Sequence, residues 1–140
     1  MKETKYMKYA SMEAEKSLFY NKHGTIIVSR GKIVARGHNN IRSMKYQRES
    51  SSCHSEMDAL SKLSDRFRKL PISVYNARIN KHGHLKESAP CKHCMEYMSS
   101  FFNVRYISFI NKDGDIVKEN MRNFTTNHVT HGNRLSRSLK

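Results

Sequence analysis

Two short segments constrain the fold of this chain more than any other feature. They are His54-Ser55-Glu56 and Pro90-Cys91-Lys92-His93-Cys94. A catalytic zinc site takes three protein ligands from imidazole and thiolate groups and leaves a fourth position for water. His54, Cys91 and Cys94 make that number, and Glu56 is then the remaining acid, able to move protons. The sequence therefore predicts one zinc ion (Zn2+) per chain at a hydrolytic site.

Both halves of the predicted site belong at helix N-termini. Cys91 and Cys94 follow Pro90, a residue favoured in the first helical turn, and their spacing places them on one face. The positive end of that helix also stabilises thiolates. His54 and Glu56 would point about 200° apart on a continuous helix, so they can converge only where a helix begins. Apolar residues at near-helical spacing follow as far as Pro71, namely Met57, Leu60, Leu63, Phe67 and Leu70.

Together, the order and spacing of the two segments resemble the signature of the zinc-dependent cytidine and deoxycytidylate deaminase superfamily. Either half alone is a weak signal, because Cys-x-x-Cys also occurs in redox pairs and structural zinc knuckles. The resemblance implies that Glu56 is catalytic and that the backbone amide of Ser55 faces the attacking water or the leaving oxygen. Ser55 departs from the small apolar residue usual in the family, but its small side chain should be tolerated. The alternative is a zinc-binding relative without turnover, and the intact Glu56 argues against it.

The order of the remaining elements predicts an α/β fold. A first helix is indicated by a stripe of residues with Gly24 as its stop, namely Met7, Ala10, Ala14 and Leu18. Apolar, β-branched runs predict five strands, at residues 25–29, 32–36, 72–79, 106–110 and 115–118. The cysteine helix should end near Phe102. This order resembles the deaminase core over residues 5–120, a three-layer α/β/α sandwich around a mixed five-stranded sheet.

The last two predicted strands bear on the substrate. Only residues 111–114 separate them, and Asp113-Gly114 is a hairpin signal, so the pair should be antiparallel. In the superfamily, that arrangement resembles the branch acting on free cytidine. A histidine ligand in His-x-Glu is instead more typical of deoxycytidylate, guanine and polynucleotide deaminases. The two signals conflict, so the reaction class is better defined than the substrate.

Two further positions are predicted to contact the substrate. The segment Gly37-His38-Asn39 resembles the end of the family's first hairpin, where the asparagine amide holds the substrate's sugar or base. Asn39 followed by Asn40 is also a plausible turn by itself, and a turn role is the alternative. The backbone carbonyl of Ala89 stands where relatives contact the departing amino group.

The formal net charge of +14 predicts an anionic partner or environment. Arg42, Lys45 and Arg48 fall in a loop that should border the pocket, where they could bind a nucleotide phosphate or a polynucleotide backbone. Residues 121–140 contain no acidic residue, and their composition favours partial disorder or folding on a partner. We therefore expect a deaminase domain at residues 1–120 and a basic tail at residues 121–140.

Composition excludes several other classes of protein. No apolar run approaches 18 residues, so no transmembrane helix is expected, and the polar first ten residues do not resemble a secretory signal. Of three cysteines, only Cys53 is left outside the predicted metal site, which excludes a disulfide framework and favours an intracellular location in cytoplasm or nucleus.

The sequence thus predicts a hydrolase that converts a cytosine nucleoside or nucleotide, such as cytidine, deoxycytidine or dCMP, to the uracil compound and ammonia. The family resemblance also implies a homo-oligomer, either a dimer or a tetramer. A deaminase acting on RNA or single-stranded DNA is the second hypothesis, since the basic loop and tail could follow a strand.

Overall fold

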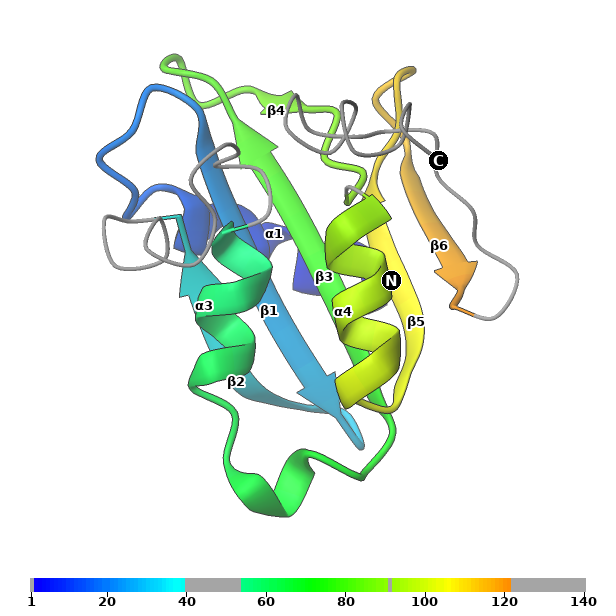
Figure 1. The fold of residues 1–140 in the computed structure, drawn as a ribbon. Coiled ribbons are helices and arrows are strands. Elements are labelled where there is room, and N and C mark those ends of the chain that lie inside the picture. The colour runs from blue at the N-terminus through cyan, green and yellow to red at the C-terminus, as the bar shows by residue number, and fades with distance from the viewer. Residues whose placement is uncertain (1, 40–53, 91, 122–140) are drawn as a thin grey trace, which may run out of the picture.

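A mixed β-sheet forms the middle layer of the molecule, with helices on both of its faces (Figure 1). The computed structural model describes residues 2–39, 54–90 and 92–121. The main strands lie side by side in the order β2-β1-β3-β5-β6, and the short β4 pairs with β3. The strands are β1 (Lys22–Ser29), β2 (Lys32–His38), β3 (Ile72–Ile79), β4 (Leu85–Lys86), β5 (Val104–Ile110) and β6 (Ile116–Asn120).

Helix α1 (Lys2–Ala14) lies behind the sheet in Figure 1, whereas α3 (His54–Ser61) and α4 (Lys92–Phe101) lie in front of it. A 3-10 turn, η2 (Asp65–Phe67), joins α3 to β3. These three layers confirm the predicted sandwich. None of the helices in the described residue ranges has the length and apolar character needed to cross a membrane.

The strand pairing confirms the predicted mixed sheet and its final hairpin. β3 and β5 are parallel, whereas β5 and β6 are antiparallel. The side chain of Asn111 shapes the connecting turn, since its Oδ1 accepts hydrogen bonds from the backbone N–H groups of Asp113 and Asp115, both at 3.0 Å. Gly114 follows with a positive φ of 85°, a conformation that glycine adopts without steric cost.

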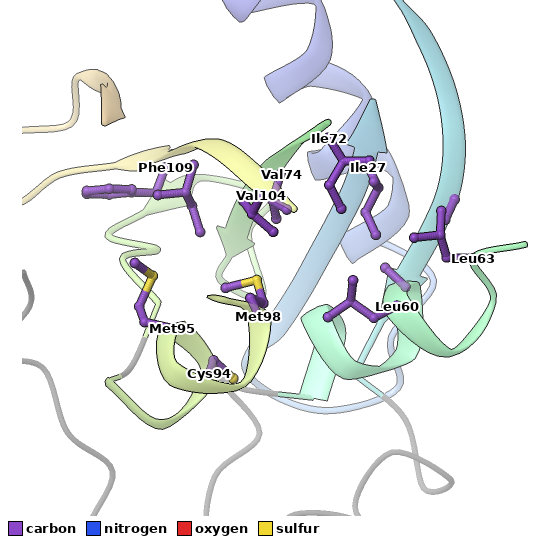
Figure 2. Packing of buried hydrophobic residues seen from close by; sticks show 13 residues of the cluster. Ile27, Leu60, Leu63, Ile72, Val74, Cys94, Met95, Met98, Val104 and Phe109 are labelled. Atoms are coloured by element: carbon purple, nitrogen blue, oxygen red, sulfur yellow. The ribbon is translucent and has the colours of Figure 1, made fainter. Parts of the chain in front are cut away.

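Alternation along the strands divides the buried apolar residues between two clusters. The α1 cluster combines Tyr6, Met7 and Ala10 of the helix with the strand residues Ile26, Val28, Tyr75, Ala77 and Ile110. Ile27 and Val74, one position along their strands, belong to the α3/α4 cluster on the opposite face, together with Ala59 and Leu60 of α3 and Cys94, Met95 and Met98 of α4. Figure 2 shows Leu60 of α3 and Met95 and Met98 of α4 pointing from that side toward the strands.

The prediction of five strands was wrong by one, because the described residues form a sheet of six. The additional strand, β4, has two residues and pairs antiparallel with Arg78 and Ile79 of β3. Both of its side chains are exposed. A strand this short gives no alternating pattern, so only its pairing identifies it.

The predicted first helix was too long. α1 ends at Ala14, and Leu18, which was placed on its buried stripe, is 97% exposed. Gly24 is not the helix stop but a residue of β1, where a Cβ atom would lie 2.1 Å from the carbonyl oxygen of Ala10 and 2.4 Å from the nitrogen of Ala14. This glycine therefore allows the helix backbone to approach the strand.

The helix that carries the first half of the site was also predicted too long. α3 ends at Ser61, where the Ser61 hydroxyl donates to the carbonyl oxygen of Asp58 at 2.7 Å. Such a bond competes with continued helix pairing. The N–H groups of Lys62 and Leu63 bond three residues back, which tightens the last turn. Leu63 is nevertheless buried, as its place in the apolar pattern predicted.

Candidate active site

The two helices that carry the predicted site begin at the same end of the sheet (Figure 1). Glu56 lies in the first turn of α3, and Cys94 lies near the start of α4. Their side chains are hydrogen-bonding partners, and both residues are almost completely buried, with 2% and 1% exposure. The fold therefore brings one residue from each predicted segment into contact.

Burial dominates the electrostatics of this pair. Removal from solvent raises the pKa of Glu56 to about 7, although hydrogen bonds from Cys94, Ser55 and Thr25 partly offset that shift by favouring the charged form. Burial also raises the pKa of the Cys94 thiol, and the neighbouring charge of Glu56 acts in the same direction. Two adjacent acidic groups are thus buried in a site where the charged form of each is disfavoured.

A cation would stabilise the charged forms of both groups, so Cys94 and Glu56 fit the predicted zinc site. The Oε2 atom of Glu56 is buried and has no hydrogen-bond partner within the described part of the chain. A thiolate is a zinc ligand, and a nearby carboxylate with one oxygen unpartnered can act on a water molecule beside the metal. Cys91 and the side chain of His54 lie outside the description, and the described side chains alone form no group of three ligand-type residues.

A polar network holds the other oxygen of Glu56. Ser55 Oγ lies 3.2 Å from Glu56 Oε1 and 2.9 Å from Thr25 Oγ1, and Thr25 Oγ1 lies 2.9 Å from Asn76 Oδ1. All four side chains are buried. Ser55, predicted to contact the substrate through its backbone amide, thus also has a hydroxyl that faces inward.

Sequence reasoning missed Thr25 and Asn76. A signal for Asn76 was available, because asparagine is depleted in strands and this one lies on the same face as the buried Val74. Thr25 gave no such signal, since threonine is a good strand former. Their meeting depends on the antiparallel register of β1 and β3, in which Thr25 and Asn76 are direct partners.

Asn39, the second predicted substrate contact, is fully buried with its side chain bonded to backbone. Its Oδ1 accepts from the N–H of His23 at 3.0 Å, and its Nδ2 donates to the carbonyl oxygen of Asn21 at 2.8 Å. These bonds fasten the end of β2 to the start of β1. They give the side chain a structural role between distant segments, while the binding role and the turn role both stay predictions.

Ala89 is fixed by its neighbour in the chain. Ser88 exchanges hydrogen bonds with the backbone of Ile110, and its hydroxyl donates to the carbonyl oxygen of Asn76 at 2.9 Å. The segment that precedes Cys91 is thereby attached to β3 and β5. Ala89 is half-buried and packs against the α3/α4 cluster, and its contact with the departing amino group stays a prediction.

The remaining predicted contacts fall outside the described residues. These are Arg42, Lys45 and Arg48 of the basic loop, together with Cys53 and all but the first residue of the 121–140 tail. Their proposed contacts with phosphate or nucleic acid stay predictions.

Comparison with solved structures identifies the fold. A cytidine deaminase from Burkholderia pseudomallei matches with a TM-score of 0.53 and 18% identity, covering 84% of this chain and 91% of that one. A mutant cytidine deaminase from Mycobacterium tuberculosis matches with a TM-score of 0.50 and 14% identity, covering 84% and 89%. The chain therefore has the fold of the cytidine deaminases.

Sequence comparison gives the family. The family described as "Cytidine and deoxycytidylate deaminase zinc-binding region" matches residues 1–110, and the chain belongs to it. A search among curated proteins gave no match. Family membership confirms the resemblance drawn from the two segments and supports a deaminase activity.

Proposed function

We propose that this protein is a zinc-dependent hydrolytic deaminase that converts a cytosine nucleoside or nucleotide to the corresponding uracil compound. The observation that carries the proposal is the buried Glu56 carboxyl, in contact with Cys94 and with Oε2 unpartnered among the described residues. A buried polar atom without a partner is costly, so it indicates a group reserved for a ligand. Family membership supports the reaction class.

In this proposal each residue has a separate task. His54, Cys91 and Cys94 would hold zinc, which supplies the Lewis-acid chemistry that makes a water molecule acidic near neutral pH. Glu56 accepts one proton from the attacking water and donates it to the ring nitrogen. It then accepts the second proton of that water from the new hydroxyl group and donates it to the departing amine. The amine leaves as ammonia, and the oxygen of water stays on the ring carbon. Asn39 and Ala89 are proposed to contact the substrate.

The second candidate function, deamination of RNA or single-stranded DNA, is favoured by the net charge of +14. A polynucleotide needs several phosphate contacts along a track, whereas a mononucleotide needs one local charge clamp. Arg42, Lys45 and Arg48 are proposed to serve in either case. We also propose that the protein assembles as a homo-oligomer, as the family resemblance implies.

A substrate panel tests the proposal directly. Zinc-loaded full-length protein is incubated with cytidine, deoxycytidine, their monophosphates, guanine and an RNA pool, while ammonia release and the zinc content per chain are measured. We expect one zinc per chain and turnover of a cytosine nucleoside or nucleotide. Activity on RNA alone, with a steep dependence on salt, would establish the second candidate instead.

Glu56→Gln is the matched control, because the amide keeps the shape of the side chain but cannot carry the proton. We expect it to retain zinc and fold while kcat falls by about 100-fold or more, as is typical when a general acid-base group is removed. A variant that keeps more than about a tenth of the wild-type rate would contradict this role.

A further inference from the structure

Four buried polar side chains form a continuous chain of contacts that ends on the catalytic carboxyl. Thr25 and Asn76 are cross-strand partners on β1 and β3, and they lie on the same sheet face as Ile27 and Val74. This face is apolar along its middle and becomes polar at the end where α3 and α4 begin. There Thr25 contacts Ser55, and Ser55 contacts Glu56.

The number of available protons limits the directions of the hydrogen bonds among these four side chains. Each hydroxyl donates once, so the contacts are all satisfied only when every donor points the same way along the chain. A charged Glu56 accepts at Oε1 from Ser55, and the single Thr25 proton then goes either to Ser55 or to the carboxyl itself. In both cases the Asn76 amide turns its Nδ2 toward Thr25. A neutral Glu56 donates from Oε1, and the chain runs in reverse to Asn76 Oδ1. Either direction engages Oε1.

We propose that Thr25, anchored by Asn76, is a positioning residue that holds the Glu56 carboxyl, both through Ser55 and by its own contact with that carboxyl, and so directs Oε2 toward the reacting groups. This inference rests on the proposed function, because it assigns separate tasks to the two oxygens of the catalytic carboxyl. Its geometric basis is the 2.9 Å and 3.2 Å contacts and the unpartnered state of Oε2 among described residues. Preorganised support of this kind is how active sites keep a reacting atom in place.

Burial separates this role from direct contact with substrate. Thr25 is 0% exposed, and its hydroxyl already has Ser55 and Asn76 as neighbours. A side chain that touched substrate would change KM when altered. A side chain that only orients Glu56 changes kcat, because the misplacement is felt in the proton transfers.

Thr25→Val tests the proposal, since it replaces the hydroxyl by a methyl group of similar size. In zinc-loaded full-length protein we expect kcat to fall by about 10- to 100-fold, the usual effect of removing an outer-shell partner, with KM little changed. Thr25→Ser should restore most of the rate because it restores the hydroxyl. Ile27→Val, on the same face of the same strand, controls for altered packing. Ser55→Ala should reproduce the loss and replaces Thr25→Val if that variant does not fold.

An infrared measurement supplies a readout that needs no turnover. The band of the Glu56 carboxyl is identified by difference from Glu56→Gln, and we expect it to shift in Thr25→Val and Ser55→Ala but not in Ile27→Val. If the wild type deaminates nothing, the proposed function fails, yet this band still decides the positioning role. An unshifted band, a kcat equal to that of Ile27→Val, or a change confined to KM would overturn the inference.

Discussion

The two faces of the sheet bury similar apolar residues but end differently. On the α1 face, Tyr6 and Tyr75 pack as a tilted ring pair, and the cluster around them is apolar. On the α3/α4 face, the apolar cluster gives way to Thr25, Ser55, Glu56 and Asn76 at the end where the helices begin. Buried polar groups cost free energy unless they are paired. The buried carboxylate of α1, Glu13, is paired with Lys16 at 2.7 Å, whereas Glu56 on the second face has its Oε2 without a partner among the described residues. In the proposed function, the first face serves mainly stability and the second also contains the reacting groups.

Each face contains a glycine at which a helix backbone touches a strand, and these glycines give the largest expected effect. A Cβ atom at Gly37 would lie 2.3 Å from the nitrogen of Ala59 in α3, while one at Gly24 would meet the backbone of α1. Backbone atoms cannot move aside, so Gly37→Ala and Gly24→Ala should each cost more than the roughly 1–3 kcal/mol typical of overpacking. Urea denaturation measures this loss.

The two glycine variants should differ in activity. Gly37→Ala displaces α3, which carries Ser55 and Glu56, so the folded fraction at low temperature should be nearly inactive. Gly24→Ala displaces α1 and should keep kcat per folded molecule. Gly83→Ala is the control, because a Cβ atom there meets nothing within 4 Å and the cost is limited to that of its positive φ. Equal activity losses in the Gly37 and Gly24 variants would remove the functional distinction between the faces.

Ile26 and Ile27 allow the same comparison from adjacent positions. Both are fully buried in β1, Ile26 in the α1 cluster and Ile27 in the α3/α4 cluster. Truncation of either to alanine should cost about 2–5 kcal/mol of unfolding free energy, the usual range for a buried isoleucine. Ile27→Ala should also lower kcat, because Ile27 is two residues from Thr25 and supports the same face. If both variants lose stability and activity in the same proportion, the division of tasks is wrong.

The sequence predicted the elements whose signal is local. Residues 72–79 form β3 with the predicted bounds, because a β-branched run between Pro71 and Asn80 leaves little choice. The antiparallel pairing of the last two strands was equally predictable, since a four-residue connection can form a hairpin but is too short for the crossover that a parallel pair needs. Family membership was also predictable, because it depends on residue types at fixed spacing in two segments.

The features that were missed depend on contacts between distant segments. Gly24 resembled a helix stop in its local sequence, but its actual neighbours are Ala10 and Ala14 of a helix packed across the strand. Leu18 continued the helical stripe, yet α1 had already ended. The pairing of Thr25 with Asn76 required the register of β1 on β3, which periodicity alone does not give. Local pattern therefore pointed to Glu56, the proposed catalytic residue, but not to the buried residues that contact it.

The smallest predicted effect concerns His38, at the edge strand where the two faces meet. His38 Nδ1 lies 4.0 Å from Glu13 of α1, and its backbone N–H donates to Asp58 of α3 at 3.1 Å. Burial lowers the pKa of His38, and Lys62 and Lys16 act in the same direction, while Asp58 and Glu13 partly oppose them.

The sign of the pH effect follows from this lowered pKa. The unfolded chain binds a proton on His38 more readily than the folded chain does, so His38 contributes stability above its ordinary pKa of 6.5 that is lost as the pH falls through the lower folded value. We therefore expect the free energy of unfolding to fall less between pH 7 and pH 5 in His38→Gln than in the wild type. This difference should be smaller than the losses of unfolding free energy expected for the glycine and isoleucine variants. His82→Gln, at an exposed loop position, controls for the loss of a histidine as such. If the wild type instead became more stable than His38→Gln as the pH fell, the attraction of Glu13 and Asp58 for a charged His38 would outweigh burial. Ion pairs from His38 to α1 and α3 would then link the two faces at this edge of the sheet.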